Sequence, residues 1–251
     1  MQDEIELLKK RFLELSRKAS DGSYFTYTDF LGLSELSALS SVKNQLQSEV
    51  RLFGGAMGAE RVVARFGSVE DIGYDAEFPI KALEILPRDK KFAEKLSHRD
   101  YLGALLNLGI ERSTLGDIVI TPERTYLFAL EDMAEYITTS LERVRRTDVI
   151  VKEADSLPEG ELYKTEMRRI TVESERIDAV IAKIYNLSRQ DAQALIKRSL
   201  VFVDGRECTS NSYKPKPDEK ISVRGHGRLI FRGVSGTTKR DRLALMIEVY
   251  I

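Results

Sequence analysis

The pattern of apolar and polar positions between Arg176 and Gly205 predicts two short helices followed by a strand. Starting at Ile177, four apolar residues stand at positions i, i+3, i+4 and i+7, which places them on one face of a helix. Ser188 is a typical N-cap residue, and the acceptor Asp191 follows three residues later. We therefore expect a second helix to begin directly after Ser188.

The second helix has two different faces. Ala192 and Ile196 are apolar and lie on one face, whereas Arg189, Gln193 and Lys197 recur every four residues along another. We expect the apolar face to pack and the basic face to point outward.

A strand and a tight turn are expected next. Residues 201–203 are β-prone, and Asp204-Gly205 is a dipeptide that readily supplies positive φ angles.

This order of elements resembles the small RNA-binding domain first seen in ribosomal protein S4. The matching residues are Arg-Ile-Asp at 176–178, Ser-Arg at 188–189 and Val-Asp-Gly at 203–205. Ser199 departs from the pattern, because the family commonly has a glycine there, so we expect a strained or shifted cap at that helix end. The resemblance implies RNA binding through a polar set of residues: Arg176, Ser188, Arg189, Gln193, Lys197 and Arg198.

The N-terminal residues predict helices and one strand. Residues 3–20 have apolar positions at helical spacing, with acidic residues early and basic residues later, as the helix dipole favours. The aromatic run at 24–30 is expected to pack in a core, and Ser34 is a plausible cap for a helix that continues to about Val50. Residues 61–66 alternate as a strand does.

The middle of the chain predicts the split β-α-β-β-α-β plan, which is called ferredoxin-like and which RNA-recognition modules (RRMs) also use. The aromatic signatures of those modules are absent, so a scaffold role and RNA binding through the sheet both stay open. The expected elements are a strand at 79–86, a helix at 97–108, a hairpin at 117–130, a helix at 131–141 and a strand at 149–151.

We therefore expect an α+β protein. An N-terminal helical segment and a ferredoxin-like (RRM-like) α/β plait precede a small S4-like αα-β domain. The expected boundaries are 1–75 for the N-terminal segment, 76–155 for the ferredoxin-like domain, 156–173 for a linker or strand that includes a loop at 157–160, and 174–251 for the S4-like domain.

Five short motifs stand out in the first half of the chain: Phe-Gly-Gly at 53–55, Ala-Glu-Arg at 59–61, Leu-Ser-His-Arg-Asp-Tyr-Leu-Gly at 96–103, Leu-Gly-Ile-Glu-Arg at 108–112 and Leu-Gly-Asp-Ile at 115–118. With these motifs the chain resembles the bacterial YlmH family over nearly its whole length. The resemblance implies RNA binding and a link to the translating ribosome, with large subunits that carry tRNA as the expected partner. Genes of the family often lie among cell-division genes.

A second candidate site lies at the start of the predicted helix at 97–108. Ser97, His98 and Arg99 stand where free backbone N–H groups can bind a phosphate. The alternative is that Ser97 only caps the helix and His98 is a surface residue, since neutral histidine binds anions poorly.

The net charge of −1 hides an uneven distribution. Residues 172–251 contain 15 Lys and Arg against 10 Asp and Glu, whereas residues 1–171 contain 24 against 30. A basic C-terminal domain attracts phosphates, although a mixed solvated surface explains the same counts.

Composition excludes several other classes. The chain has 251 residues, 42% hydrophobic and 31% charged, and it shows neither a signal peptide pattern nor an apolar run that would span a membrane. The single cysteine, Cys208, has no partner for a disulfide or a zinc site, so we expect a structural role for it and a cytoplasmic location. No metal is expected, and no cofactor motif is recognised.

Three function classes stay open. The first is a noncatalytic protein that binds structured rRNA or tRNA in translation or ribosome quality control. The second is an RNA-modifying enzyme such as a pseudouridine synthase relative, although Ile230 follows Gly-Arg-Leu at 227–229 where those enzymes have their nucleophilic aspartate. The third is a structural protein of cell division.

Overall fold

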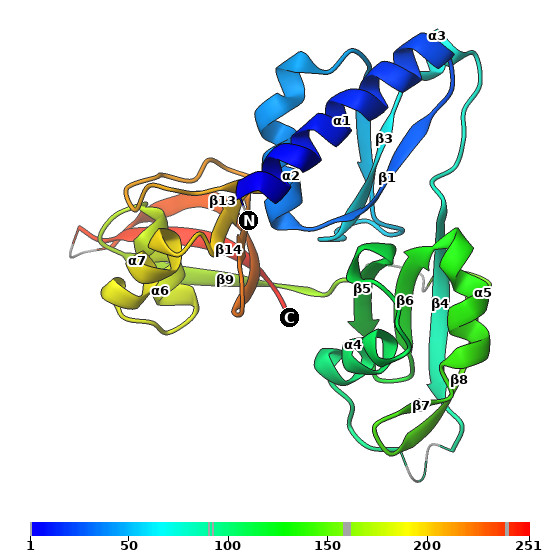
Figure 1. The fold of residues 1–251 in the computed structure, drawn as a ribbon. Coiled ribbons are helices and arrows are strands. Elements are labelled where there is room, and N and C mark those ends of the chain that lie inside the picture. The colour runs from blue at the N-terminus through cyan, green and yellow to red at the C-terminus, as the bar shows by residue number, and fades with distance from the viewer. Residues whose placement is uncertain (1, 90, 92, 158–161, 239–240) are drawn as a thin grey trace. The chain divides into compact units, whose positions relative to one another are not determined.

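The computed structural model describes residues 2–89, 91, 93–157, 162–238 and 241–251. They form two compact units (Figure 1). The N-terminal unit consists of Met1–Gly32 and Val42–Tyr163, and the C-terminal unit consists of Leu33–Ser41 and Lys164–Ile251. The domain boundaries expected from the sequence stay a prediction.

The N-terminal unit begins with the predicted helix α1 (Gln2–Gly22), which packs on a three-stranded sheet. Phe12 of α1 is fully buried, and its ring centroid lies 6.5 Å from that of Phe66 in the sheet. Within the aromatic run, Phe25 and Phe30 are buried, as expected. The sheet order is β1 (Thr26–Leu31), β3 (Val62–Phe66) and β2 (Val50–Phe53), and a short helix α3 (Val69–Ile72) follows.

The helix expected from Ser34 to about Val50 is shorter than the sequence suggests. Helix α2 (Leu33–Val42) starts before Ser34, and the 3-10 turn η1 (Lys43–Gln45) follows it. The next apolar residues form β2, in which Val50 pairs with Phe66 and Phe53 pairs with Val63 of β3. This pairing partner lies further along the chain, so the local pattern does not reveal it.

The ferredoxin-like part has the predicted order of elements. Its five-stranded antiparallel sheet follows the order β5-β6-β4-β8-β7, and α4 and α5 pack on one face around Leu83, Leu105 and Ile137. The elements are β4 (Ile80–Pro87), α4 (His98–Asn107), η3 (Arg112–Thr114), β5 (Leu115–Ile120), β6 (Thr125–Leu130), α5 (Glu131–Ser140), β7 (Arg143–Val144) and β8 (Thr147–Glu153).

The opposite face of this sheet is largely covered. Phe128 and Leu130 of β6 pack against Phe30 of β1 and Val63 of β3, and Phe128 is completely buried. Tyr126 is also buried. RNA-recognition modules stack bases on exposed aromatic residues of the corresponding face. The structure therefore favours the scaffold role for this face.

Arg61 holds the two sheets of the N-terminal unit together. Its guanidinium donates to the carbonyl oxygens of Leu115 and Phe30, both at 2.8 Å, and of Arg112 at 3.1 Å. A Cβ on Gly116 would lie 2.7 Å from the Phe30 ring, so the two sheets approach too closely there for a side chain.

Asp117 adds a second connection at the same place. Its carboxylate accepts hydrogen bonds from the backbone N–H groups of Glu60 and Arg61 at 2.7 and 3.1 Å, and from the Tyr163 hydroxyl at 2.8 Å. The motifs at 59–61 and 115–118 thus join the two sheets.

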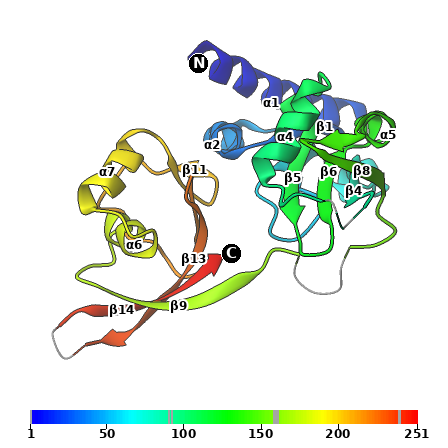
Figure 2. The same ribbon diagram turned by 90° about the horizontal axis from the view of Figure 1, so that it is seen from below.

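The C-terminal unit is a curled antiparallel sheet with two helices in its hollow (Figure 2). The sheet order is β11-β10-β12-β13-β14-β9. The elements are β9 (Thr165–Val172), α6 (Ile177–Ile184), α7 (Arg189–Lys197), β10 (Val201–Val203), β11 (Arg206–Glu207), β12 (Lys220–Val223), β13 (Gly227–Thr237) and β14 (Leu243–Tyr250).

Most local predictions for this unit are confirmed. Both helices begin at the expected residues, and the φ angles of Asp204 and Gly205 are 47° and 74°. Ser199 has a φ of 56°, which is the expected strained cap. Cys208 lies in the core.

The last strand, β14, does not lie at the edge of the sheet, because β9 pairs along all of it. Strand β13 begins at Gly227 and pairs with β12 on one side and β14 on the other. Of the interdomain loop expected at 157–160, residues 158–160 lie outside the described residues.

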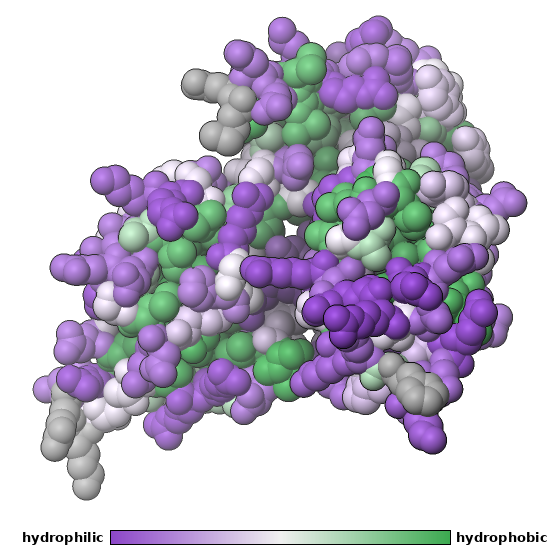
Figure 3. All heavy atoms as spheres, turned by 60° about the horizontal axis from the view of Figure 1, so that its bottom comes forward, coloured by the Kyte–Doolittle hydropathy of each residue, from purple (hydrophilic) through white to green (hydrophobic). Residues whose placement is uncertain are grey.

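The surface is mixed in character. Hydrophilic side chains cover most of the face in Figure 3, and apolar side chains lie between them. In the part of the chain that the structure describes, no helix is long and apolar enough to span the lipid bilayer.

Asp117→Ala should destabilise the N-terminal unit. The variant leaves two backbone N–H groups and a hydroxyl without their acceptor, which costs about 1–3 kcal/mol when such groups are buried. Urea unfolding of the full chain measures the loss. The matched control is Asp155→Ala, since that side chain is 97% exposed. Equal stability of the two variants would contradict the joining role of Asp117.

Candidate RNA-binding surface

The α6–α7 pair is held rigidly by its core and by the turn between the helices. Ile177, Val180 and Ile181 of α6 are fully buried, as their spacing predicts. The Ser188 hydroxyl accepts a hydrogen bond from the backbone N–H of Asp191 at 3.0 Å and donates to its carboxylate at 2.7 Å. Ser188 is therefore the N-cap of α7, and its hydroxyl is already in use.

Asp178 is a fully buried carboxylate between the two helices. Arg176 donates to it from Nε and Nη2 at 3.2 and 3.0 Å. Arg189 donates from Nη2 to both oxygens at 2.9 and 3.0 Å, and Gln193 donates from Nε2 at 2.9 Å. These five hydrogen bonds satisfy both carboxylate oxygens, which a charge in the core requires.

The pKa of Asp178 lies below its ordinary value. Burial raises the pKa of a carboxyl, but hydrogen bonds from Gln193 and Arg176 and the charge of Arg189 together outweigh burial here. Asp178 is therefore ionised at neutral pH. The cluster of Arg176, Asp178 and Arg189 keeps one net positive charge at the surface.

Further cations lie on and beside α7. Lys197 and Arg198 are exposed at its C-terminal end, and within the described residues neither side chain has a hydrogen bond or ion pair. Lys183 and Arg189 line a hollow of about 410 Å³ between α6, α7 and β9. The side chain of Arg189 is 44% exposed, so it can contact a ligand while it bonds to Asp178.

The predicted residues thus divide into three groups. Arg176, Arg189 and Gln193 surround one carboxylate, Ser188 caps α7, and Lys197 and Arg198 extend into solvent. Asp178 itself was missed as the organising residue. The signal was present, because Asp178 is the one carboxylate among the apolar residues that begin α6.

The second candidate site is arranged differently. At the N-terminus of α4, the Asp100 carboxylate accepts from both the backbone N–H and the hydroxyl of Ser97, at 2.8 and 2.7 Å. This carboxylate lies where a phosphate was expected to bind. Partial desolvation and the nearby charge of Arg112 lower the pKa of His98, so His98 is neutral at physiological pH. Arg99 is exposed and keeps its charge available.

A helix pair set against a curled antiparallel sheet, with its basic residues organised around one carboxylate, defines an S4-type domain. In agreement, residues 175–221 match the family described as "S4 domain", and residues 74–157 match the family described as "Putative RNA-binding domain in YlmH".

Over 240 residues the chain is 30% identical to the Ribosome-associated protein quality control protein P2 of Bacillus subtilis (strain 168). The matched region covers 94% of this chain and 91% of that protein. The chain belongs to the YlmH family. It is also similar to a solved structure, the cell division protein ylmH from Streptococcus pneumoniae, at 19% identity and a TM-score of 0.49, over 60% of this chain and 91% of that one.

Asp178→Asn should destabilise the C-terminal unit at neutral pH by about 1–3 kcal/mol, because hydrogen bonds to a charged acceptor are lost. The effect should depend on pH. A carboxyl with a pKa lowered by folding stabilises the folded state above its unfolded pKa of about 4 and stops doing so as the pH falls through its folded pKa.

Urea unfolding of the full chain from pH 7 to pH 3 tests this expectation. The difference between wild type and Asp178→Asn should narrow below about pH 4. The exposed Asp155→Asn is the control and should follow wild type throughout. A difference that stayed constant over the whole range would show that Asp178 is not ionised in the folded protein.

Proposed function

We propose that this protein is a noncatalytic RNA-binding protein and that the exposed face of α7 holds folded RNA of the ribosome, either rRNA or tRNA. The observation that carries the proposal is the position of Lys197 and Arg198 on a helix whose orientation the buried Asp178 cluster holds. Arg176 and Arg189 are 37% and 44% exposed and add positive charge beside this face, and Gln193 bonds to Asp178 with them.

The chemistry of this surface suits a phosphate backbone. Long cationic side chains on a rigid helix contact phosphates and the shape of a folded RNA, and they do not require a particular base sequence. The excess of basic residues in the C-terminal part of the chain also supports RNA binding by this part, since positive charge attracts RNA at long range.

A ribosomal partner is supported by the relative from Bacillus subtilis, whose name describes a ribosome-associated quality control protein. We propose the large subunit carrying tRNA as the particle, which places the protein's work in the cytoplasm. The acidic N-terminal part of the chain repels RNA at long range and so limits indiscriminate binding.

The enzymatic alternative has little support in this chain. Ile230, at the position of the pseudouridine synthase aspartate, lies inside β13 and pairs with Lys220 on one side and Glu248 on the other. An aliphatic side chain in an interior strand cannot attack a base. Among the described residues, no group of His, Cys, Asp or Glu has the arrangement of a metal site.

The variant Lys197→Ala/Arg198→Ala should bind a structured RNA hairpin more weakly and with a smaller dependence on salt. Removing two phosphate contacts lowers the slope of log K against log salt by about 1 per contact. Fluorescence anisotropy between 50 and 300 mM KCl measures both quantities. The control is Lys9→Ala/Lys10→Ala on α1, which changes the net charge equally.

Sucrose-gradient profiles of cells that express the two variants test the ribosomal part of the proposal. Wild type and the α1 control should sediment with large subunits, and the Lys197/Arg198 variant should remain at the top of the gradient. If that variant still sedimented with ribosomal particles as wild type does, α7 would not be the anchor. If the Lys197/Arg198 variant lost affinity for the RNA hairpin but wild type itself did not sediment with ribosomal particles, the cell-division alternative would be favoured.

A further inference from the structure

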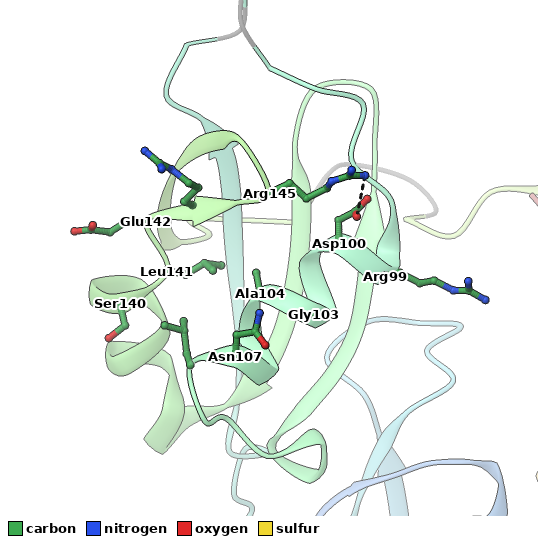
Figure 4. A pocket seen from close by; sticks show the side chains of 11 residues that line it. Arg99, Asp100, Gly103, Ala104, Asn107, Ser140, Leu141, Glu142 and Arg145 are labelled. Atoms are coloured by element: carbon green, nitrogen blue, oxygen red, sulfur yellow. Dashed lines mark hydrogen bonds and ion pairs between the residues drawn. The ribbon is translucent and has the colours of Figure 1, made fainter.

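A groove of about 570 Å³ lies between α4 and the segment that joins α5 to β7 (Figure 4). Gly103 and Ala104 of α4 line one side, and Ser140 at the end of α5 lies across from them. The sheet-covering contacts do not use this surface, and it belongs to residues 74–157, which match the family described as "Putative RNA-binding domain in YlmH".

Gly103 is the unusual residue of this groove. It lies in the interior of α4, where glycine destabilises a helix relative to alanine. Its φ is not positive, and a Cβ at this position would meet nothing within 4 Å among the described residues. Nothing inside the chain therefore requires a glycine. The lack of a larger side chain here leaves the groove open beside the backbone of α4.

The two ends of the groove differ in the groups that line them. Arg145 extends across one end from the segment after β7 and pairs with Asp100 of α4 at 3.4 Å. At the other end Asn107 and Ser140 close α4 and α5, where unpaired carbonyl oxygens give a helix terminus negative partial charge. Among the described residues, the side chains of Asn107 and Ser140 have no hydrogen-bond partner.

This arrangement matches one nucleotide. Arg145 suits a phosphate, because an exposed ion pair with Asp100 is weak and a phosphate can replace it. Asn107 and Ser140 suit the polar edge of a base, and the backbone of Gly103 suits its flat face. Glu142 also lines the groove, but its carboxylate points away from it (Figure 4).

We propose that this groove binds an unstacked nucleotide of single-stranded RNA, with the phosphate at Arg145 and the base between Gly103 and Ser140. The inference rests on the proposed RNA-binding function and adds a second, separate contact to it. Two contacts on one chain strengthen each other, because the second forms at a high effective concentration.

Gly103→Leu tests the groove in the full chain, and Gly103→Ala is its matched control. Leucine favours the helix and fills the groove, whereas a methyl group occupies open space. For a 12-nucleotide single-stranded RNA of mixed sequence, Gly103→Leu should weaken binding by about tenfold, which corresponds to about 1.4 kcal/mol of lost contact, and Gly103→Ala should bind within about twofold of wild type. Duplex RNA of the same length should bind all three proteins alike.

Arg145→Asn provides a second variant, because asparagine tolerates the left-handed φ of 53° at this position. It should also weaken single-stranded RNA binding. Crosslinking of 4-thiouridine RNA to the full chain should label peptides that contain residues 97–107 or 140–145, and Gly103→Leu should abolish that label.

Three outcomes would overturn the proposal. The first is that Gly103→Leu and Arg145→Asn bind single-stranded RNA as wild type does. The second is that Gly103→Leu loses affinity for duplex RNA as much as for single-stranded RNA. The third is that wild type binds polyglutamate and Gly103→Leu does not, which would indicate a site for an acidic peptide. Repeating the measurements in the Lys197→Ala/Arg198→Ala background separates the two sites. Gly103→Leu should still weaken binding of single-stranded RNA in that background. The proposal for the α7 surface and the proposal for the groove can therefore fail independently.

Discussion

The buried carboxylate of Asp178 is the constraint on which the C-terminal unit depends. A charge without water needs several donors, and its donors come from two helices, so the charge is satisfied only when α6 and α7 keep one relative orientation. The orientation of α7 in turn sets the direction of its exposed basic face. Folding and the presentation of the candidate RNA-binding surface are therefore the same event in this domain.

This constraint divides the work among the basic residues. Arg176 and Arg189 compensate Asp178 and share its charge, so their removal affects folding as well as binding. Within the described residues, Lys197 and Arg198 form no ion pair with a carboxylate. Their positive charge has little structural role, so the proposed RNA binding can be tested through them separately from stability.

The N-terminal unit shows how a common fold changes its use. A ferredoxin-like sheet offers one face to its helices and the other to a ligand, but here Phe128 packs under the N-terminal sheet and Arg61 ties the two layers together. With that face covered, the remaining surfaces are the helices and the sheet edges. The groove beside Gly103 lies on this remaining surface.

The sequence by itself determined the elements that local spacing encodes, including α6, α7, the cap at Ser188 and the ferredoxin-like order. Periodicity and capping act within a few residues, so they can be read directly. Only the tertiary structure decided that β2 is a strand, that Phe128 is covered, and that the arginines of the predicted surface turn to Asp178. Each of these depends on a partner far away in the chain or on a carboxylate that becomes costly only once it is buried, and residue spacing records neither.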